Sequence, residues 1–82
     1  MIPIKDLLNK IKWDKRELPE EYLVYYLDRI SQKLIKINYN DIKKFEDNFI
    51  VIEKNNEETY IPMHRIKEVR KNNVLVWKRS IL

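Results

Sequence analysis

The chain of 82 residues contains no cysteine, no glycine and a single histidine. Without cysteine it has neither a disulfide framework nor thiolate metal ligands, and one imidazole is too few for a zinc site built on histidines. No apolar run approaches the roughly 20 residues of a membrane-spanning helix. The N-terminal segment also lacks the uninterrupted apolar core of a signal peptide. We therefore expect a soluble, cytoplasmic protein that uses no metal or other cofactor and has no membrane partner.

The length and composition are those of a small folded unit. Hydrophobic residues make up 44% of the chain and charged residues 37%. This apolar content is sufficient for folding to compete with the loss of conformational entropy, and 82 residues are too few for two cores. We expect a single domain over residues 1–82, whose oligomeric state the sequence does not determine.

The first half of the chain predicts one helix and two strands. Apolar residues with the i, i+3, i+4, i+7 spacing of an amphipathic helix follow Pro3, which predicts a helix over about residues 3–12. Trp13, at its end, is expected to pack. Residues 22–28 are rich in aromatic and branched side chains, which favours a central strand. Residues 33–39 alternate between apolar and polar side chains, as in a half-exposed strand.

The rest of the chain repeats itself at an offset of 24 residues, and no gap is needed to align the copies. The paired positions, first copy and then second, are Ile37 and Ile61, Ile42 and Ile66, Lys43 and Lys67, Phe45 and Val69, Asn48 and Asn72, Ile50 and Val74, Val51 and Leu75, Ile52 and Val76, and Lys54 and Lys78. Each copy predicts a hairpin unit, over about residues 37–54 and 61–78. In the second unit Asn72-Asn73 can supply the positive φ angles of a tight two-residue turn, since glycine is absent.

Two copies are too few for a solenoid, so a curled antiparallel sheet is the favoured product. We predict an α+β fold in which an N-terminal helix precedes about five antiparallel strands. These strands are expected to form a small SH3-like or Sm-like barrel, or a strongly curled sheet, with the helix on an open end. A flat sheet with a helix on one face is the alternative.

The two copies differ most at the turn, where basic groups replace neutral and acidic ones. Asn40-Asp41 in the first copy corresponds to His64-Arg65 in the second, just after Pro62. A ring N–H and a guanidinium fork behind a rigid proline are suited to binding one phosphate or cyclic phosphate. On spacing alone, an equally good interpretation is that His64 only caps the turn, as Asn40 does in the other copy.

Five further residues are weaker candidates for contacts with RNA. Trp77 replaces Glu53 in the repeat and is either a core residue, which we favour, or a platform for stacking a base. Asp28 and Arg29 are either a surface ion pair, again the favoured reading, or a second basic group with a carboxylate that orients it. Lys67 and Arg79 belong to a basic C-terminal part, where six Lys and Arg stand against one Glu after residue 63.

The sequence resembles a known family, the RNA cyclic group end recognition domain, over nearly its whole length. The resemblance rests on LLNKIKW, EEYLVYYLDR, IPMHRIKEV and the closing VLVWKR. It implies recognition of RNA ends that carry a 2′,3′-cyclic phosphate or a related group. It also implies that His64 and Arg65, with Asp28 and Arg29 as weaker candidates, contribute to that site. The sequence departs from the family in having Asn72-Asn73 where a glycine is expected in the final hairpin.

Three functions remain open at this stage. The leading prediction is a non-catalytic RNA-binding module that recognises terminal phosphate groups. Its expected partners are RNA and RNA-processing proteins. A protein-interaction adaptor that uses an exposed sheet edge is the first alternative. The second is a cyclic phosphodiester hydrolase, which is disfavoured because one histidine without a metal cluster leaves few groups for acid–base chemistry.

Overall fold

A computed structural model describes residues 2–79 and has one helix, α1 (Ile4–Trp13), followed by seven strands. The strands are β1 (Tyr22–Leu27), β2 (Leu34–Asn38), β3 (Ile42–Phe45), β4 (Phe49–Lys54), β5 (Glu57–Pro62), β6 (Ile66–Lys71) and β7 (Val74–Lys78). Three short 3₁₀ turns, η1 (Pro19–Glu21), η2 (Tyr39–Asp41) and η3 (Met63–Arg65), connect them. The helix begins and ends one residue later than the periodicity predicted.

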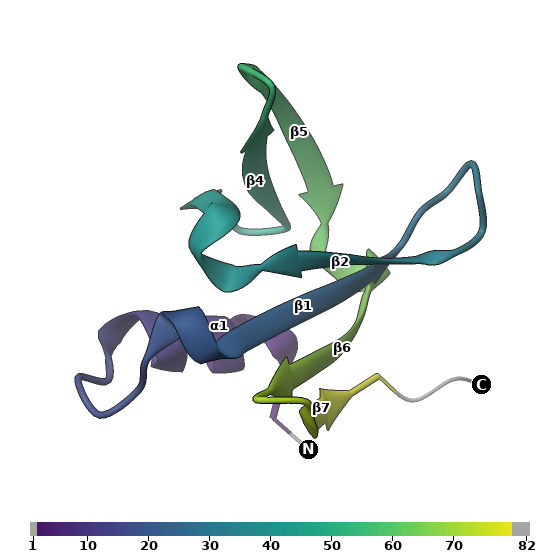
Figure 1. The fold of residues 1–82 in the computed structure, drawn as a ribbon. Coiled ribbons are helices and arrows are strands. Elements are labelled where there is room, and N and C mark those ends of the chain that lie inside the picture. Colours follow the sequence, from purple (N-terminus) through teal and green to yellow (C-terminus); the bar gives the residue numbers. More distant parts are fainter. Residues whose placement is uncertain (1, 80–82) are drawn as a thin grey trace.

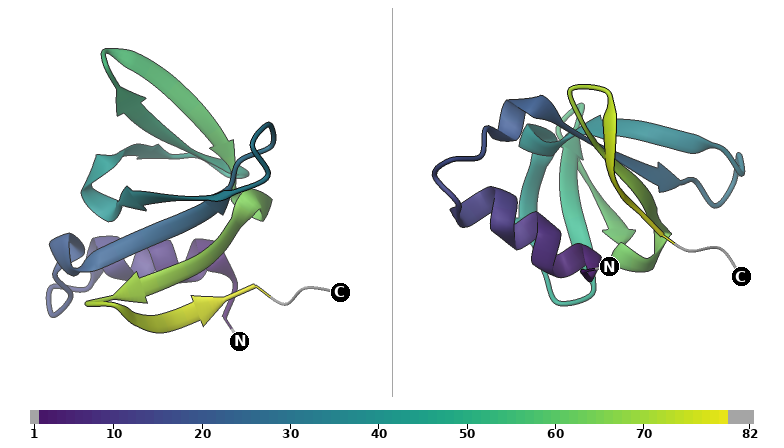
Figure 2. Two further views of the ribbon diagram at one scale, coloured as in Figure 1. Left: turned by 45° about the vertical axis from the view of Figure 1, so that its right-hand side comes forward. Right: turned by 90° about the horizontal axis from the view of Figure 1, so that it is seen from below.

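The strands pair antiparallel in two sheets (Figure 1). The larger has the order β2-β1-β6-β7, and the smaller has the order β3-β4-β5. The prediction of an α+β fold with an N-terminal helix and antiparallel strands is therefore confirmed. There are seven strands rather than about five, and they do not form a closed barrel. In Figure 2 the β4–β5 hairpin stands away from the four-stranded sheet.

The internal repeat of the sequence corresponds to a repeat in the fold. The segment β2-η2-β3 is followed, 24 residues later, by β5-η3-β6, and in each segment the 3₁₀ turn carries the chain from one sheet to the other. The pairing registers also agree, since Val24 lies opposite Ile37 and Ile50 lies opposite Ile61. Exchanging β1 with β4, β2 with β5 and β3 with β6 converts the order β2-β1-β6 into β5-β4-β3. The molecule therefore has an approximate internal two-fold, to which α1 and β7 are additions.

Even the irregularities of the two sheets match. The register skips Lys43 where β3 pairs with β4, and it skips Lys67 where β6 pairs with β1. These two lysines are equivalent in the sequence repeat. Such a bulge bends its strand locally, so both sheets bend at the same point of the repeat.

The core lies between the two sheets and α1. Its fully buried side chains include Leu8 and Ile11 of the helix and Val24, Ile50 and Ile66 of the strands. Figures 1 and 2 show α1 lying along one side of the strands. No helix within residues 2–79 is long and apolar enough to cross a membrane.

Two hydrogen bonds fasten the N-terminal segment to the strands. The Tyr39 hydroxyl donates to the carbonyl oxygen of Leu8 at 2.7 Å, and the Trp77 ring N–H donates to the carbonyl oxygen of Ile2 at 2.8 Å. Trp77 is only 6% exposed. Trp13, in contrast, is 73% exposed, so the expectation that it packs was wrong. It lies two residues beyond Ile11, off the buried face of α1.

Paired asparagines make two of the tight turns. Asn72 and Asn73 have φ angles of 49° and 69°, as the absence of glycine predicted, and Asn55 and Asn56 do the same between β4 and β5, at 54° and 66°. Asparagine tolerates this left-handed region better than most residues do. In the β6–β7 turn, the Asn72 side chain also donates to a carboxylate oxygen of Glu21 at 2.7 Å.

The turn geometry predicts opposite effects of two substitutions at Asn73. Asn73→Gly should leave the free energy of unfolding unchanged or raise it, whereas Asn73→Ala should lower it by about 1 kcal/mol, because alanine disfavours positive φ. Urea denaturation followed by circular dichroism measures both. Asn40→Ala, in the exposed part of η2, is the control and should be neutral. Equal stability of the Ala and Gly variants would contradict the turn geometry.

Candidate functional site: two equivalent pockets between the sheets

The approximate two-fold produces two pockets of similar size, each between an end of one sheet and a corner of the other. The first has a volume of about 320 Å³ and the second about 330 Å³. The lining of the first is Lys36, Ile37, Asn38, Asp41, Ile52, Glu53, Lys54 and Asn55. The lining of the second is Tyr26, Leu27, Asp28, Arg29, Thr59, Tyr60, Ile61, Pro62 and Arg65. We call them the β2–β4 pocket and the β1–β5 pocket.

Every residue of the β2–β4 pocket has a counterpart in the β1–β5 pocket, related by the 24-residue repeat for residues 36–41 and by the exchange of β4 with β1 for residues 52–55. The equivalents, written first for the β2–β4 pocket, are Lys36 and Tyr60, Ile37 and Ile61, Asn38 and Pro62, Asp41 and Arg65, Ile52 and Tyr26, Glu53 and Leu27, Lys54 and Asp28, and Asn55 and Arg29. Only the Ile37 and Ile61 position keeps its residue. The two pockets therefore have equivalent positions in the fold, but they differ in the side chains that line them.

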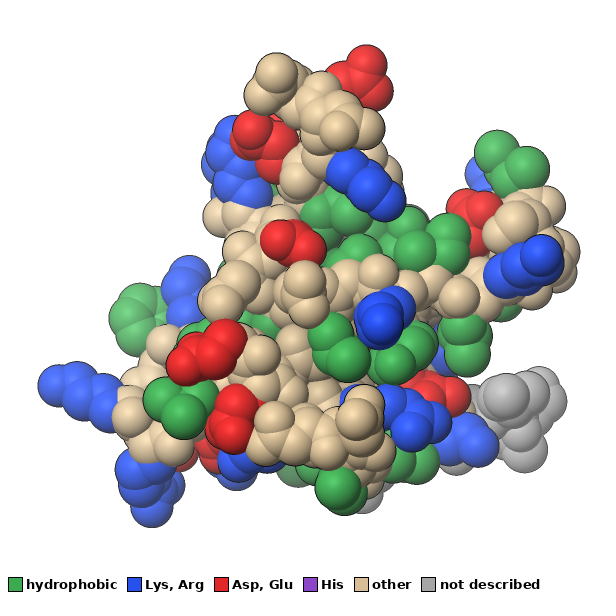
Figure 3. All heavy atoms as spheres, viewed as in Figure 1, with side chains coloured by type: hydrophobic (Ala, Val, Ile, Leu, Met, Phe, Trp, Pro, Cys, Tyr) green, Lys and Arg blue, Asp and Glu red, His purple; other side chains and the backbone are tan. Residues whose placement is uncertain are grey.

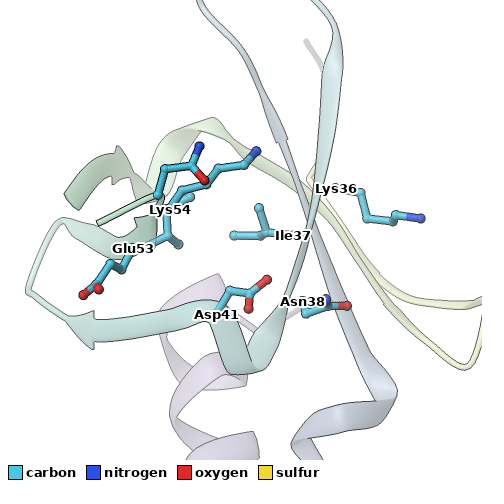
Figure 4. A pocket seen from close by; sticks show the side chains of 8 residues that line it. Lys36, Ile37, Asn38, Asp41, Glu53 and Lys54 are labelled. Atoms are coloured by element: carbon cyan, nitrogen blue, oxygen red, sulfur yellow. The ribbon is translucent and has the colours of Figure 1, made fainter. Parts of the chain in front are cut away.

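The β2–β4 pocket is polar and has no aromatic lining. Figure 4 shows Lys54 and Asp41 on opposite sides of Ile37, while the Lys36 side chain points away. Glu53 is engaged elsewhere, because its carboxylate accepts from Lys43 at 3.0 Å. The two lysines and two carboxylates of the lining cancel in formal charge. This pocket has no excess of positive charge with which to attract an anion.

The β1–β5 pocket combines two arginines with two tyrosines. Arg29 and Arg65 each carry a guanidinium group, and neither forms a salt bridge within the described residues. Tyr60 is 58% exposed and Tyr26 is partly buried. In Figure 3, hydrophobic side chains (green) line the hollow between the β4–β5 hairpin and the loop of residues 28–33. A cationic pocket with aromatic walls has the chemistry of a nucleotide site.

Asp28 is the one carboxylate in this lining and is held in its ionised form. Its oxygen accepts from the backbone N–H of Ser31 at 3.0 Å. Hydrogen bonds from the side chain and backbone of Ser31, and to a smaller extent the charge of Arg65, lower the pKa of Asp28 below its usual value. At neutral pH the pocket therefore holds two positive charges and one negative charge.

The structure separates the candidate residues of the sequence into groups. Asp28, Arg29 and Arg65 come together in the β1–β5 pocket. His64 is exposed on η3 beside Arg65 but does not line this pocket. Trp77 lies in the core, as the favoured reading held.

Lys67 and Arg79 line a third, more apolar cavity of about 300 Å³, together with Leu27, Leu34, Glu68 and Lys78. The Arg79 guanidinium donates to the carbonyl oxygens of Ile66 and Met63, at 2.9 and 3.0 Å, and therefore caps η3. The Lys67 ammonium donates to the carbonyl oxygen of His64 at 3.3 Å. Both cations thus support the backbone of the turn that carries His64 and Arg65.

Other basic side chains after residue 63 are also engaged within the fold. Arg70 pairs with Glu68 at 2.9 Å, and Lys71 pairs with Glu17 at 3.4 Å. Charge counted along the sequence therefore overstated the positive surface of this part of the chain.

The sequence reasoning missed the two tyrosines of the pocket. Tyr26 was assigned to a central strand without a function, and Tyr60 was not considered. The repeat carried a signal for Tyr60, because its equivalent is Lys36, and an aromatic residue replaces a charged one there, as Trp77 replaces Glu53.

The pocket geometry predicts how the pKa of Asp28 responds to substitution. Ser31→Ala should raise this pKa toward the usual value, because the Ser31 side chain makes the largest contribution to lowering it, and Arg65→Ala should raise it less. Titration of the Asp28 carboxyl carbon by NMR measures both changes. The lowered pKa stabilises the folded wild-type protein above the unfolded pKa, so any loss of stability in a variant should be present at neutral pH and should disappear as the pH falls through the folded pKa. A larger effect of Arg65→Ala would contradict the assignment of Ser31 as the main partner.

Comparison with known proteins shows the family to which the chain is related. The family model described as the MJ1316 RNA cyclic group end recognition domain matches residues 1–79. A UPF0248 protein of Saccharolobus islandicus strain M.14.25 is 35% identical over 79 residues, covering 93% of this chain and 98% of the relative. A UPF0248 protein of Metallosphaera sedula is 35% identical over 77 residues, covering 94% and 92%. One of Saccharolobus solfataricus is 30% identical over 80 residues, covering 94% and 96%. No solved structure matches the chain.

Proposed function

The chain belongs to the MJ1316 RNA cyclic group end recognition domain family, and we propose that its β1–β5 pocket binds RNA ends that carry a 2′,3′-cyclic phosphate. The observation that carries this proposal is the difference between the two equivalent pockets. Arg29 and Arg65 stand where the β2–β4 pocket has Asn55 and Asp41. The same corner of the fold thus acquires two guanidinium groups in only one of its two copies.

The lining suits the parts of a terminal nucleotide. Guanidinium groups donate paired hydrogen bonds to phosphate oxygens and stay charged at any physiological pH. Tyr26 and Tyr60 offer apolar ring faces on which a base or a ribose can pack. His64 lies outside the lining, next to Arg65, where it would contact the RNA strand that leads away from the pocket.

The charge of the pocket favours a cyclic phosphate over an open one. A cyclic phosphodiester carries one negative charge, whereas a terminal phosphate monoester carries between about 1.5 and 2 at neutral pH. Because Asp28 is held ionised beside Arg65, it reduces the net charge of the pocket to one positive charge, which a cyclic phosphate neutralises and a monoester exceeds. We therefore assign Asp28 the role of selecting the singly charged ligand, and recognition requires no bond of the RNA to be broken.

Loss of either pocket arginine should reduce the preference for cyclic ends. Three RNAs of one sequence, ending in a 2′,3′-cyclic phosphate, a 3′-phosphate or a 3′-hydroxyl, are compared by fluorescence anisotropy. Arg65→Ala and Arg29→Ala should each weaken binding of the cyclic end by about 10- to 100-fold, the magnitude of a lost charged hydrogen bond. Asp41→Ala and Asn55→Ala, at the equivalent positions of the β2–β4 pocket, are matched controls. Equal affinity of the wild-type protein for all three RNAs would rule out end recognition.

Asp28→Asn tests the charge argument separately. Removing the carboxylate charge should strengthen binding of the 3′-phosphate more than binding of the cyclic phosphate, and so narrow the difference between them. The same anisotropy assay, run at two salt concentrations, separates this effect from general attraction to the RNA backbone. An unchanged ratio between the two ends would mean that Asp28 does not select the ligand.

One observation favours a second function, that of a protein adaptor. The β7 strand lies at an edge of the four-stranded sheet, and its residues Val74, Leu75 and Val76 are 63%, 44% and 45% exposed. An exposed apolar edge strand can pair with a strand of another protein. Absence of RNA binding at low salt, together with recovery of a protein partner that protects β7 from hydrogen exchange, would support this function over end recognition.

A further inference from the structure

The exposed ring of Trp13 marks a second surface, away from the β1–β5 pocket. An indole is usually buried for much of its area, so a tryptophan that is 73% exposed is an informative feature. It ends α1, whose inward face is formed by other residues, and no described interaction uses the ring N–H. The packing of the fold therefore gives no reason for an indole at this position.

Basic residues flank this tryptophan in the sequence. We define the Trp13 patch as Lys10, Lys12, Trp13, Lys15 and Arg16, which lie at the end of α1 and in the turn that follows. The Lys12 ammonium stands 5.1 Å from the centre of the Trp13 ring and 5.4 Å from that of Phe45, which restricts the indole without covering it. In Figure 3, Lys and Arg side chains (blue) project from this edge of the molecule, at the left of the view.

The only carboxylate within the patch's stretch of chain is neutralised by a neighbour. Asp14 accepts two hydrogen bonds from the Arg16 guanidinium, at 3.1 and 3.0 Å, and these bonds lower its pKa to about 2. The Arg16 side chain nevertheless remains 89% exposed. None of the three lysines of the patch forms a salt bridge within the described residues, so the patch presents positive charge to an anion.

We propose that the Trp13 patch is a binding site for single-stranded RNA, in which one base stacks on the indole and the lysines contact the flanking phosphates. Sites of this kind combine cations with an exposed aromatic ring, and they tolerate any base because every base has a flat face. A protein partner would need more apolar surface than one ring, and the positive charge is complementary to a polyanion.

The position of the patch makes it a contact for RNA upstream of the bound end, and this part rests on the proposed function. The patch precedes β1 in the chain, whereas Asp28 and Arg29 follow β1. Six strand residues span about 20 Å. Figure 1 shows the end of α1 at the side of the fold opposite the loop of residues 28–33. An RNA that is bound at both the β1–β5 pocket and the Trp13 patch must therefore be several nucleotides long. A dinucleotide bound in the pocket cannot reach the patch.

RNA length is therefore the variable that tests the proposal. A dinucleotide and a 12-nucleotide RNA, both with 2′,3′-cyclic ends, are titrated against wild-type protein, Trp13→Ala and Trp13→Phe. Trp13→Ala should weaken binding of the 12-nucleotide RNA by about tenfold, the effect of one lost stacking contact, and leave the dinucleotide unchanged. Trp13→Phe should recover part of the loss because phenylalanine also stacks. Leu18→Ala, an exposed apolar residue nearby, is the control and should have no effect.

The outcomes separate this proposal from end recognition. If Trp13→Ala leaves binding of the 12-nucleotide RNA unchanged, the patch is not an RNA site, whether or not the cyclic end is preferred. If the wild-type protein shows no end preference but the Trp13→Ala effect on a 12-nucleotide RNA with a 3′-hydroxyl persists, end recognition fails and the patch stands. An equal loss for the dinucleotide would overturn the patch as an upstream contact. The proposal would also be overturned if Trp13→Ala weakened binding to anionic lipid vesicles and left binding to RNA unchanged.

Discussion

Burial of one side chain in each of two 3₁₀ turns holds the two sheets around a single core. Tyr39 of η2 and Met63 of η3 occupy equivalent positions of the repeat, and both are buried. Each turn is anchored again at its edge, through the Tyr39 hydroxyl on the Leu8 carbonyl in one case and through Arg79 on the Met63 carbonyl in the other. Because these corners set how the sheets diverge, they also create the pocket beside each corner. The scaffold of the site is thus a property of the fold, and its chemistry depends on a few lining residues.

Much of this scaffold could be predicted because its signals are local. The apolar spacing of α1 reflects a single buried face, and the 24-residue repeat reflects two copies of the same strand, corner and strand. Asn72-Asn73 predicted a tight turn because asparagine is one of the few residues other than glycine that accept a positive φ angle. In each case a short stretch of chain meets a strict geometric requirement that limits the residues it can use.

The misses arose where distant segments meet. The pairing of β1 with both β2 and β6 determines that there are two sheets, and no spacing in the sequence encodes it. Tyr60 of β5 and Arg29, which follows β1, are also distant in the sequence and meet in one pocket between the two sheets. Trp13 was wrongly expected to pack because composition alone treats an indole as core, although its position is off the buried face of α1. The charge of the basic C-terminal part overstated its positive surface, because several of its cations contact carboxylates or carbonyl oxygens of the fold.

Only the β1–β5 pocket of the two equivalent pockets is proposed to bind the RNA end. A titration of ¹⁵N-labelled protein with a nucleoside 2′,3′-cyclic monophosphate, followed by NMR chemical shifts, tests this claim most directly, because the ligand is too small to involve the rest of the surface. Saturable shifts are expected at residues 26–29, 59–61 and 65, and none at residues 36–38 and 52–55. Shifts of equal size in both pockets, or none in the first set, would contradict it.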